Sequence, residues 1–258
     1  LTVDQLVQLA AGDPAKGQGS QLGSAGISVP GSAGQTSGCA EEEGIAEIVL
    51  ADGPAGLRLN QHYTVRDGAI VPLPLEEAFE RGFLYDGPKA EGTEYYQYCT
   101  AFPIGTLLAQ SWDEELAAEV GSAAGDEMER FGITLWLAPG MNIHRNPLCG
   151  RNFEYYSEDP LVSGRIAAAV TKGVQSHPGC GTTIKHFACN NQEDNRMNSD
   201  SILSERTLRE IYLRGFGIAV REAQPMSIMT SYNLINGIHS ANNYDLCTKA
   251  ARCEFGFK

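Results

Sequence analysis

The sequence predicts an α/β fold in which short buried strands alternate with amphipathic helices. Apolar runs of strand length recur along the chain, and most of them are separated by segments with helical periodicity. Polar residues follow these runs directly, in the order Asp52, Asn142, Lys185, His186 and Tyr232. Functional side chains lie at the carboxyl ends of strands both in (β/α)₈ barrels and in doubly wound sheets. The pattern alone therefore does not separate these two architectures.

The N-terminal part begins with a predicted helix and continues into a segment of low complexity. Residues 3–11 have helical periodicity, with an apolar face formed by Val3, Leu6, Val7 and Ala10. Residues 12–38 are rich in Gly and Ser. This composition is typical of a flexible linker.

Residues 45–50 predict the first buried strand, and a turn follows it directly. The Asp52-Gly53-Pro54 turn places the Asp52 carboxylate at the carboxyl end of that strand, and Arg58 lies six residues further on. Residues 60–99 interrupt the α/β pattern with prolines, glycines and five tyrosines. We interpret this range as an insertion or a long ordered loop, not as a second domain. A buried element is predicted to resume at 101–112.

Three helices and three further strands are predicted in the rest of the chain. The helix at 113–132 has an Asp cap, an acidic first turn and a terminal Gly, and the helix after Asp159 has Pro at its first position. A third helix covers 204–223. The residues assigned to the three buried faces are Leu116, Val120 and Met128; Leu161, Ile166, Val170 and Val174; and Leu208, Ile211, Tyr212, Phe216 and Ala219. The strands are predicted at 133–138, 182–187 and 226–232.

Composition excludes several classes of partner. The net charge of −13 argues against binding to nucleic acid or to an anionic membrane surface. No apolar run approaches the roughly 20 residues that span a bilayer. Seven scattered cysteines without metal-ligand spacing predict reduced thiols in a cytoplasmic protein, with two or three disulfides as the alternative. The sequence starts at Leu1 and not at Met, so a secreted protein that has lost its signal peptide stays open.

Two dense motifs and three other segments resemble a known family. The dense motifs are GRNFEYYSEDP at 150–160 and KHFACNNQE at 185–193. The other segments are LADGPAGLR at 50–58, AFPIGTLLAQSWD at 101–113 and MTSYNLINGIHSANNYDL at 229–246. In this order they resemble the N-terminal domain of glycoside hydrolase family 3, in its bacterial β-glucosidase branch.

The resemblance implies that residues 1–258 form part of a (β/α)₈ TIM-barrel-like domain, incomplete in this chain because only five or six strand units are counted. It implies a retaining β-glycosidase, most simply a β-glucosidase that removes terminal non-reducing β-D-glucosyl residues by double displacement. The nucleophilic Asp is expected in a Ser/Thr-Asp-Trp motif after Lys258, and the acid/base in a following α/β sandwich domain that is absent here. No residue of this chain is therefore assigned as catalytic. Neither a metal nor an organic cofactor is implied. The implied partners are a β-glucoside or oligosaccharide and the remainder of the polypeptide or a complementary chain.

By the same resemblance, the substrate-binding residues are Asp52, Arg58, Arg151, Lys185, His186, Arg196 and Tyr232. Asp52 would bind two ring hydroxyls, and Lys185 and His186 would bind others through hydrogen bonds to charged or polar groups. Arg151 would lie between the sugar and the nucleophile, and Tyr232 would contact the nucleophile. The resemblance also implies that residues 12–38 form a loop near the sugar pocket, in place of a linker.

Simpler interpretations exist for each of these residues. Any Arg or Lys could form a structural ion pair, His186 could be a core group or a general base, and Tyr232 could be a core aromatic. Glu154 is interpreted as a brace for a neighbouring Arg or Lys, and Asp159 as a helix cap. For the whole chain, one alternative is a non-catalytic carbohydrate-binding protein on the same scaffold. Another is an aldolase-like barrel with Lys185 as a Schiff-base lysine.

Overall fold

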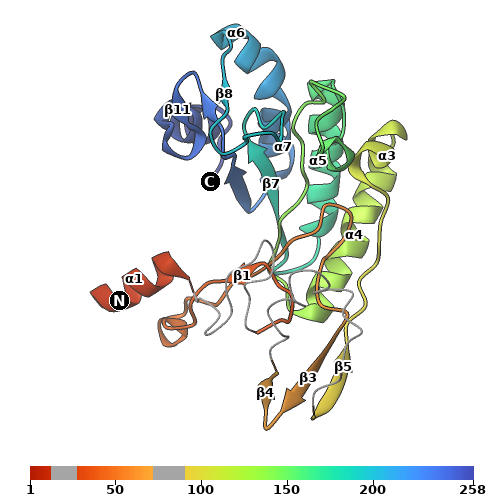
Figure 1. Cartoon of the computed structure of the whole chain (residues 1–258), viewed down its shortest axis with the longest axis vertical. Coiled ribbons are helices and arrows are strands. Elements are labelled where there is room, and N and C mark those ends of the chain that lie inside the picture. Colours follow the sequence, from red (N-terminus) through yellow and green to blue (C-terminus); the bar gives the residue numbers. More distant parts are fainter. Residues whose placement is uncertain (13–27, 72–90) are drawn as a thin grey trace. The chain divides into compact units, whose positions relative to one another are not determined.

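The computed structural model describes residues 1–12, 28–71 and 91–258. The chain forms two compact units: unit 1 comprises Leu1–Ala101 and Glu127–Trp136, and unit 2 comprises Phe102–Asp126 and Leu137–Lys258. Both contain helices and strands, so the predicted α/β class is confirmed (Figure 1). The question of linker or loop at 12–38 falls mostly on residues 13–27, outside the described residues.

Unit 1 contains the helix α1 (Val3–Ala11) and a small mixed sheet. The helix has the predicted bounds and is capped at Thr2, but none of its residues is buried. In the sheet, β1 (Gly34–Gln35) is antiparallel to β2 (Val49–Ala51), and β2 is parallel to β6 (Leu135–Trp136). A short 3₁₀ turn, η1, covers Glu41–Glu43. The strand predicted at 45–50 starts later, at Val49, and the Ile48 amide before it donates to Thr36 Oγ1.

A second sheet in unit 1 lies within the range 60–99. Its strands are β3 (His62–Arg66), β4 (Ala69–Ile70) and β5 (Thr93–Tyr96), in the antiparallel order β4-β3-β5. The turn between β3 and β4 consists of Asp67 and Gly68, both with positive φ, as a two-residue type I′ hairpin requires. Residues 72–90 of this range lie outside the described part of the chain.

Unit 2 is organised around a parallel pair of strands and three long helices. Strand β7 (Gly181–Phe187), buried along its whole length, is parallel to β9 (Ser227–Thr230), as the sequence predicts. The helices are α4 (Glu114–Phe131, whose last residues belong to unit 1), α5 (Pro160–Val174) and α7 (Arg214–Ala223). The predicted caps are confirmed: Asp113 Oδ1 accepts from the amides of Glu115 and Leu116, and Asp159 Oδ1 from that of Leu161.

The buried faces of α4 and α5 differ from the predicted ones. Leu116 and Leu161 are exposed, although Met128, Ile166, Val170 and Val174 are buried as predicted. The reason is close packing of small residues. A Cβ on Gly121 would lie 2.3 Å from the Val170 carbonyl oxygen, and one on Gly173 would lie 2.1 Å from that of Ala118. The backbones approach so closely that the larger leucines are left outside the contact.

The helix predicted at 204–223 consists of three pieces. These are α6 (Glu205–Thr207), the π-helical turn η3 (Leu208–Tyr212) and α7. A π turn adds a residue and rotates everything after it. Ile211, inside the π turn, is exposed and Leu213 is buried in its place, whereas Phe216 and Ala219 are buried as predicted.

The strand predicted at 133–138 is also shorter, because only Leu135–Trp136 forms β6. The following Ala138 and Pro139 accept hydrogen bonds from β7 through their carbonyls. The element predicted at 101–112 is the helix α3 (Gly105–Gln110), buried on one face only.

The remaining elements of unit 2 are η2 (Asn152–Glu154), β8 (Asp200–Ser201), β10 (Leu234–Ile235), β11 (Ile238–His239), η4 (Ser240–Asn242) and the π-helix η5 (Asp245–Glu254). Within the described ranges, no helix is both long and apolar enough to cross a membrane.

Candidate functional site

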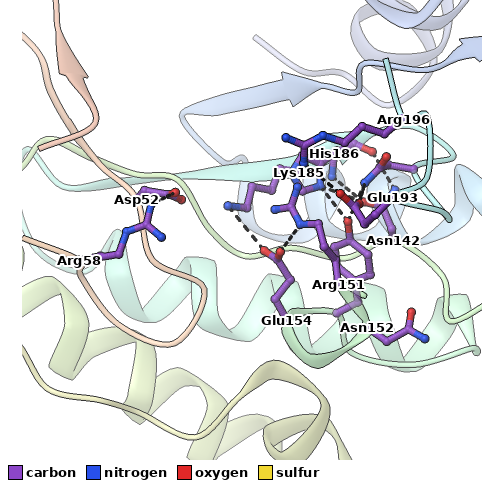
Figure 2. A network of polar contacts seen from close by, with 12 residues as sticks. Asp52, Arg58, Asn142, Arg151, Asn152, Glu154, Lys185, His186, Glu193 and Arg196 are labelled. Atoms are coloured by element: carbon purple, nitrogen blue, oxygen red, sulfur yellow. Dashed lines mark hydrogen bonds and ion pairs between the residues drawn. The ribbon is translucent and has the colours of Figure 1, made fainter. Parts of the chain in front are cut away.

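A network of polar side chains lies at the carboxyl end of β7 in unit 2 (Figure 2). Its first centre is Glu154: one carboxylate oxygen accepts from Arg151 Nε, and the other lies 3.6 Å from Lys185 Nζ. The side chains of Glu154 and Lys185 are each only 3% exposed. Because a buried ion is costly unless it is paired, these three side chains fix one another's positions. The interpretation of Glu154 as a brace is confirmed.

The turn η2 brings Glu154 to this position. Thr106 on α3 binds that turn, since its Oγ1 lies 2.8 Å from the carbonyl oxygen of Asn152 and 2.9 Å from that of Tyr155. Two glycines allow the close approach. A Cβ on Gly105 would lie 2.5 Å from the Glu154 carbonyl oxygen, and one on Gly140 would lie 3.2 Å from Glu154 Oε2. A larger residue at either position would displace the carboxylate.

A bulge in β7 brings two consecutive side chains into the same network. Lys185 pairs with Met229, and Phe187 pairs with the next residue, Thr230, so His186 is the extra residue of the bulge. In a regular strand, neighbouring side chains point to opposite faces, and a bulge is a common means of changing that direction.

His186 is buried and bound on one side of its ring. Asn142 Oδ1 accepts from the His186 amide at 2.8 Å, and Asn142 Nδ2 donates to the His186 carbonyl at 2.9 Å. This pair fixes the orientation of the Asn142 amide, whose Oδ1 also lies 3.2 Å from His186 Nδ1. Since Oδ1 can only accept, a ring proton on Nδ1 would be donated to it.

The state of the His186 ring follows from its surroundings. Burial, together with the charges of Arg151, Lys185 and Arg196, lowers the pKa of His186 well below its usual value, so the ring is neutral. Its other nitrogen, Nε2, makes no hydrogen bond to any residue that the structure describes. A neutral ring with the proton on Nδ1 presents a lone pair at Nε2, which can accept a hydrogen bond from a hydroxyl group.

The second centre of the network is Glu193. Its Oε1 accepts from Asn190 Nδ2 at 3.1 Å and its Oε2 pairs with Arg196 Nη1 at 2.9 Å. The Arg196 guanidinium lies over the ring of Tyr232, 5.3 Å from its centroid. Tyr232 is 48% exposed, so the alternative of a core aromatic is wrong.

Tyr155 connects His186 to the second centre. Its hydroxyl lies 3.2 Å from His186 Nδ1 and accepts from Asn190 Nδ2 at 3.0 Å. Burial raises the pKa of the Tyr155 phenol, so it stays protonated. One unbroken set of contacts therefore runs from His186 to Arg196.

Cations outnumber carboxylates in this network. The cations are Arg151, Lys185 and Arg196, and the carboxylates are Glu154 and Glu193. Burial opposes the charge of Arg151, but its hydrogen bond to Glu154 and the nearby carboxylates of Glu154 and Glu193 outweigh this effect and raise its pKa. The named ionic groups thus leave one positive charge, which a further carboxylate could balance.

Unit 1 contributes a separate ionic turn after β2. Asp52 Oδ2 pairs with Arg58 Nη2 at 2.7 Å, and the Asp52 carbonyl accepts from the Arg58 amide at 2.8 Å. The turn is tight, because a Cβ on Gly53 would lie 1.9 Å from the Gly56 carbonyl oxygen. Trp136 Nε1 donates to the Gly53 carbonyl at 2.6 Å. The side chains of Asp52 and Arg58 are 24% and 34% exposed.

The residues predicted to bind substrate thus fall into two groups. Unit 2 brings together Arg151, Lys185, His186, Arg196 and Tyr232, and unit 1 brings together Asp52 and Arg58. Sequence reasoning missed Tyr155, Asn190 and Glu193. Asn190 and Glu193 lie in a loop, where no helical or strand spacing marks them.

Metal and disulfide chemistry find no support in the described residues. Within them, no group of three or more His, Cys, Asp or Glu side chains could bind a metal ion. All seven cysteines are free thiols. The Schiff-base alternative for Lys185 would require this amine to leave its ion pair with Glu154.

Comparison with known proteins gives concordant results. The model of the family described as "Glycosyl hydrolase family 3 N terminal domain" matches residues 88–258. The curated protein beta-glucosidase A of Butyrivibrio fibrisolvens is 39% identical over the whole chain, which spans 26% of that protein. An exo-alpha-(1->6)-L-arabinopyranosidase of Bifidobacterium longum is 42% identical over 84% of the chain, which spans 26% of its length.

A solved structure is also similar. Beta-glucosidase 3B from Thermotoga neapolitana, in complex with glucose, superposes on the whole chain with a TM-score of 0.79 and 45% identity. The chain covers 32% of that structure. It therefore spans about a quarter to a third of the length of these three proteins.

Proposed function

Because the chain belongs to glycosyl hydrolase family 3, we propose that it forms the sugar-binding part of a retaining β-glycosidase, with terminal non-reducing β-D-glucosyl residues as substrate. The observation that carries this proposal is the pairing of Lys185 and His186 in one buried network at the end of β7. A fixed ammonium group donates hydrogen bonds, and a neutral imidazole with a lone pair at Nε2 accepts them. Neighbouring hydroxyls of one sugar ring need both a hydrogen-bond donor and an acceptor.

The Asp52 turn of unit 1 is proposed to bind sugar hydroxyls as well. A carboxylate accepts from two hydroxyls at once, and its ion pair with Arg58 orients it without burying it. Arg151 and Tyr232 are proposed to contact the nucleophile. The cations of the network in unit 2 suit a nucleophilic carboxylate supplied by another part of the protein.

We further propose that the chain works within a longer polypeptide, as part of a (β/α)₈ barrel in which residues 60–99 are an insertion. Supporting this, the chain spans only a fraction of its relatives, and the parallel pairs β2–β6 and β7–β9 agree with barrel topology. In double displacement, the nucleophile attacks the anomeric carbon and water then releases the sugar, so the configuration is retained. In this scheme the chain's own residues bind and orient the sugar.

The test uses the polypeptide at the full length that its gene encodes. It should hydrolyse p-nitrophenyl β-D-glucopyranoside, and proton NMR should detect the β-anomer as the first glucose released. p-Nitrophenyl α-L-arabinopyranoside is the comparison substrate, since one relative is named for that activity. Release of the α-anomer first would exclude the retaining mechanism. Glucose binding without hydrolysis of any glycoside would favour a non-catalytic carbohydrate-binding protein.

A further inference from the structure

The antiparallel sheet of unit 1 carries aromatic side chains that the proposed function does not use. The strand register pairs His62 with Tyr96 and Tyr63 with Tyr95. Because neighbouring residues alternate between faces, the first pair lies on one face of the sheet and the second pair on the other. The ring centroids are 6.0 Å apart in the first pair and 5.5 Å apart in the second.

Cross-strand pairing accounts for both pairs, but not for Tyr98, which extends the aromatic row on one face. Tyr63 and Tyr95 are direct cross-strand partners with nearly parallel rings, an arrangement that stabilises a sheet. On the other face, the aromatic row continues past the end of β5 to Tyr98, whose ring centroid is 5.8 Å from that of Tyr96. Tyr98 has no cross-strand partner in the described sheet, and it is 65% exposed, with Tyr96 at 53%. Exposed rings in a row of this kind mark an interaction surface.

We propose that the aromatic row of His62, Tyr96 and Tyr98 is a second carbohydrate-binding surface, whose ligand is a neutral glucan chain. The choice of a glucan rests on the proposed function. An aromatic ring presents an apolar face to the C–H groups of a pyranose ring, while the phenol and imidazole edges bind hydroxyls. The register places Glu94 on the same face, and its carboxylate can accept hydrogen bonds from a sugar.

Charge favours a sugar over the other ligands that stack on aromatic rings. Nucleobases stack in the same way, but nucleic-acid sites combine the rings with several cations for the phosphates. On this face, the register places one cation, Arg66, together with the carboxylate of Glu94, and the chain as a whole has a net charge of −13. A neutral chain of hydroxyl-rich rings fits this surface, and a polyanion does not.

The experiment is affinity electrophoresis of the full-length polypeptide in gels that contain soluble mixed-linkage β-glucan. Excess glucose is present to occupy the proposed sugar site. The wild type should be retarded, and the double variant Tyr96→Ala/Tyr98→Ala should bind roughly tenfold or more weakly. Tyr96→Phe/Tyr98→Phe keeps the ring faces and should be retarded like the wild type. Tyr95→Ala, on the opposite face, is the matched control and should also bind normally.

Hydrolysis of p-nitrophenyl β-D-glucopyranoside is measured on the same proteins and separates the two proposals. Lost retardation with unchanged hydrolysis in the double alanine variant would support the second surface. An unretarded wild type, or equal retardation of both proteins, would overturn it, whatever the activity. Retardation of an inactive wild type would overturn the proposed function and leave the glucan surface in place. If the double variant fails to fold, the single variant Tyr98→Ala tests the residue that no strand pairing requires.

Discussion

Two ion pairs, each between a carboxylate and a basic side chain, differ in their solvent exposure. Glu154 and Lys185 in unit 2 are 3.6 Å apart with both side chains 3% exposed, whereas Asp52 and Arg58 in unit 1 are 2.7 Å apart and 24% and 34% exposed. The buried pair is the looser one, because Glu154 also binds Arg151. Burial makes the members of the first pair depend on each other for stability, and exposure leaves the second pair open to a ligand. We therefore expect stability effects from the first and binding effects from the second.

The largest effect should come from Glu154→Gln. This change keeps the side-chain volume but leaves Arg151 and Lys185 without their shared carboxylate. Removing one partner of a buried ion pair costs about 3–5 kcal/mol in the free energy of unfolding. Urea denaturation measures this loss. Glu158→Gln, an exposed carboxylate four residues away, is the control and should change little. Equal midpoints for the two variants would show that the network is not structural.

The second effect concerns Asp52→Ala, which should reduce activity far more than stability. Each hydrogen bond lost between a charged group and a sugar hydroxyl is worth about 1.5–3 kcal/mol, so kcat/KM for the glucoside should fall roughly tenfold to several hundredfold. Because the pair with Arg58 is partly exposed, the free energy of unfolding should change by about 1 kcal/mol or less. Unchanged kinetics would make Asp52 a residue of the turn alone.

The third effect is a pH dependence due to His186. Its pKa in the folded protein lies well below 6.5, so below pH 6.5 the unfolded state binds a proton that the folded state does not. Stability should therefore fall as the pH decreases from about 6.5, by up to about 1.4 kcal/mol per pH unit. His186→Gln should reduce this slope, and His239→Gln, at an exposed histidine, should not. Parallel slopes for wild type and His186→Gln would contradict a neutral buried ring.

The smallest effect is expected at the exposed pair of Asp245 and Lys249 on η5. These side chains are 73% and 59% exposed and 2.6 Å apart. Ion pairs in such positions contribute little, because water and salt screen them. Asp245→Ala should leave both the unfolding midpoint and kcat/KM unchanged. A loss of activity here would mean that η5 has a role in the site that burial and charge do not indicate.

Local sequence signals predicted much of the fold. Asp159-Pro160 marked the start of α5, and the apolar run before Lys185 marked β7. The exposure of Leu116 and Leu161 could not be predicted in this way. It depends on how closely Gly121 and Gly173 allow two helices to approach, which is a property of their contact. The π turn at Leu208–Tyr212 likewise has no local pattern that distinguishes it from an α-helix.

The same distinction applies to the candidate site. Lys185 and His186 could be found because they follow a strand directly. Glu193 and Asn190 lie in a loop without periodicity, and their role becomes visible only where the chain brings them to Tyr155 and Arg196. The proton position on the His186 ring is even harder to predict from the sequence, since it depends on how the Asn142 amide is oriented.

Calorimetric titration of the full-length polypeptide with glucose tests most directly the claim that this chain supplies the sugar site. The wild type should bind one glucose, and Asp52→Ala should bind it at least roughly tenfold more weakly, which is the loss of one charged hydrogen bond. Asp245→Ala should bind it like the wild type. Equal affinity of Asp52→Ala and wild type, or no binding of glucose by the wild type, would contradict the account.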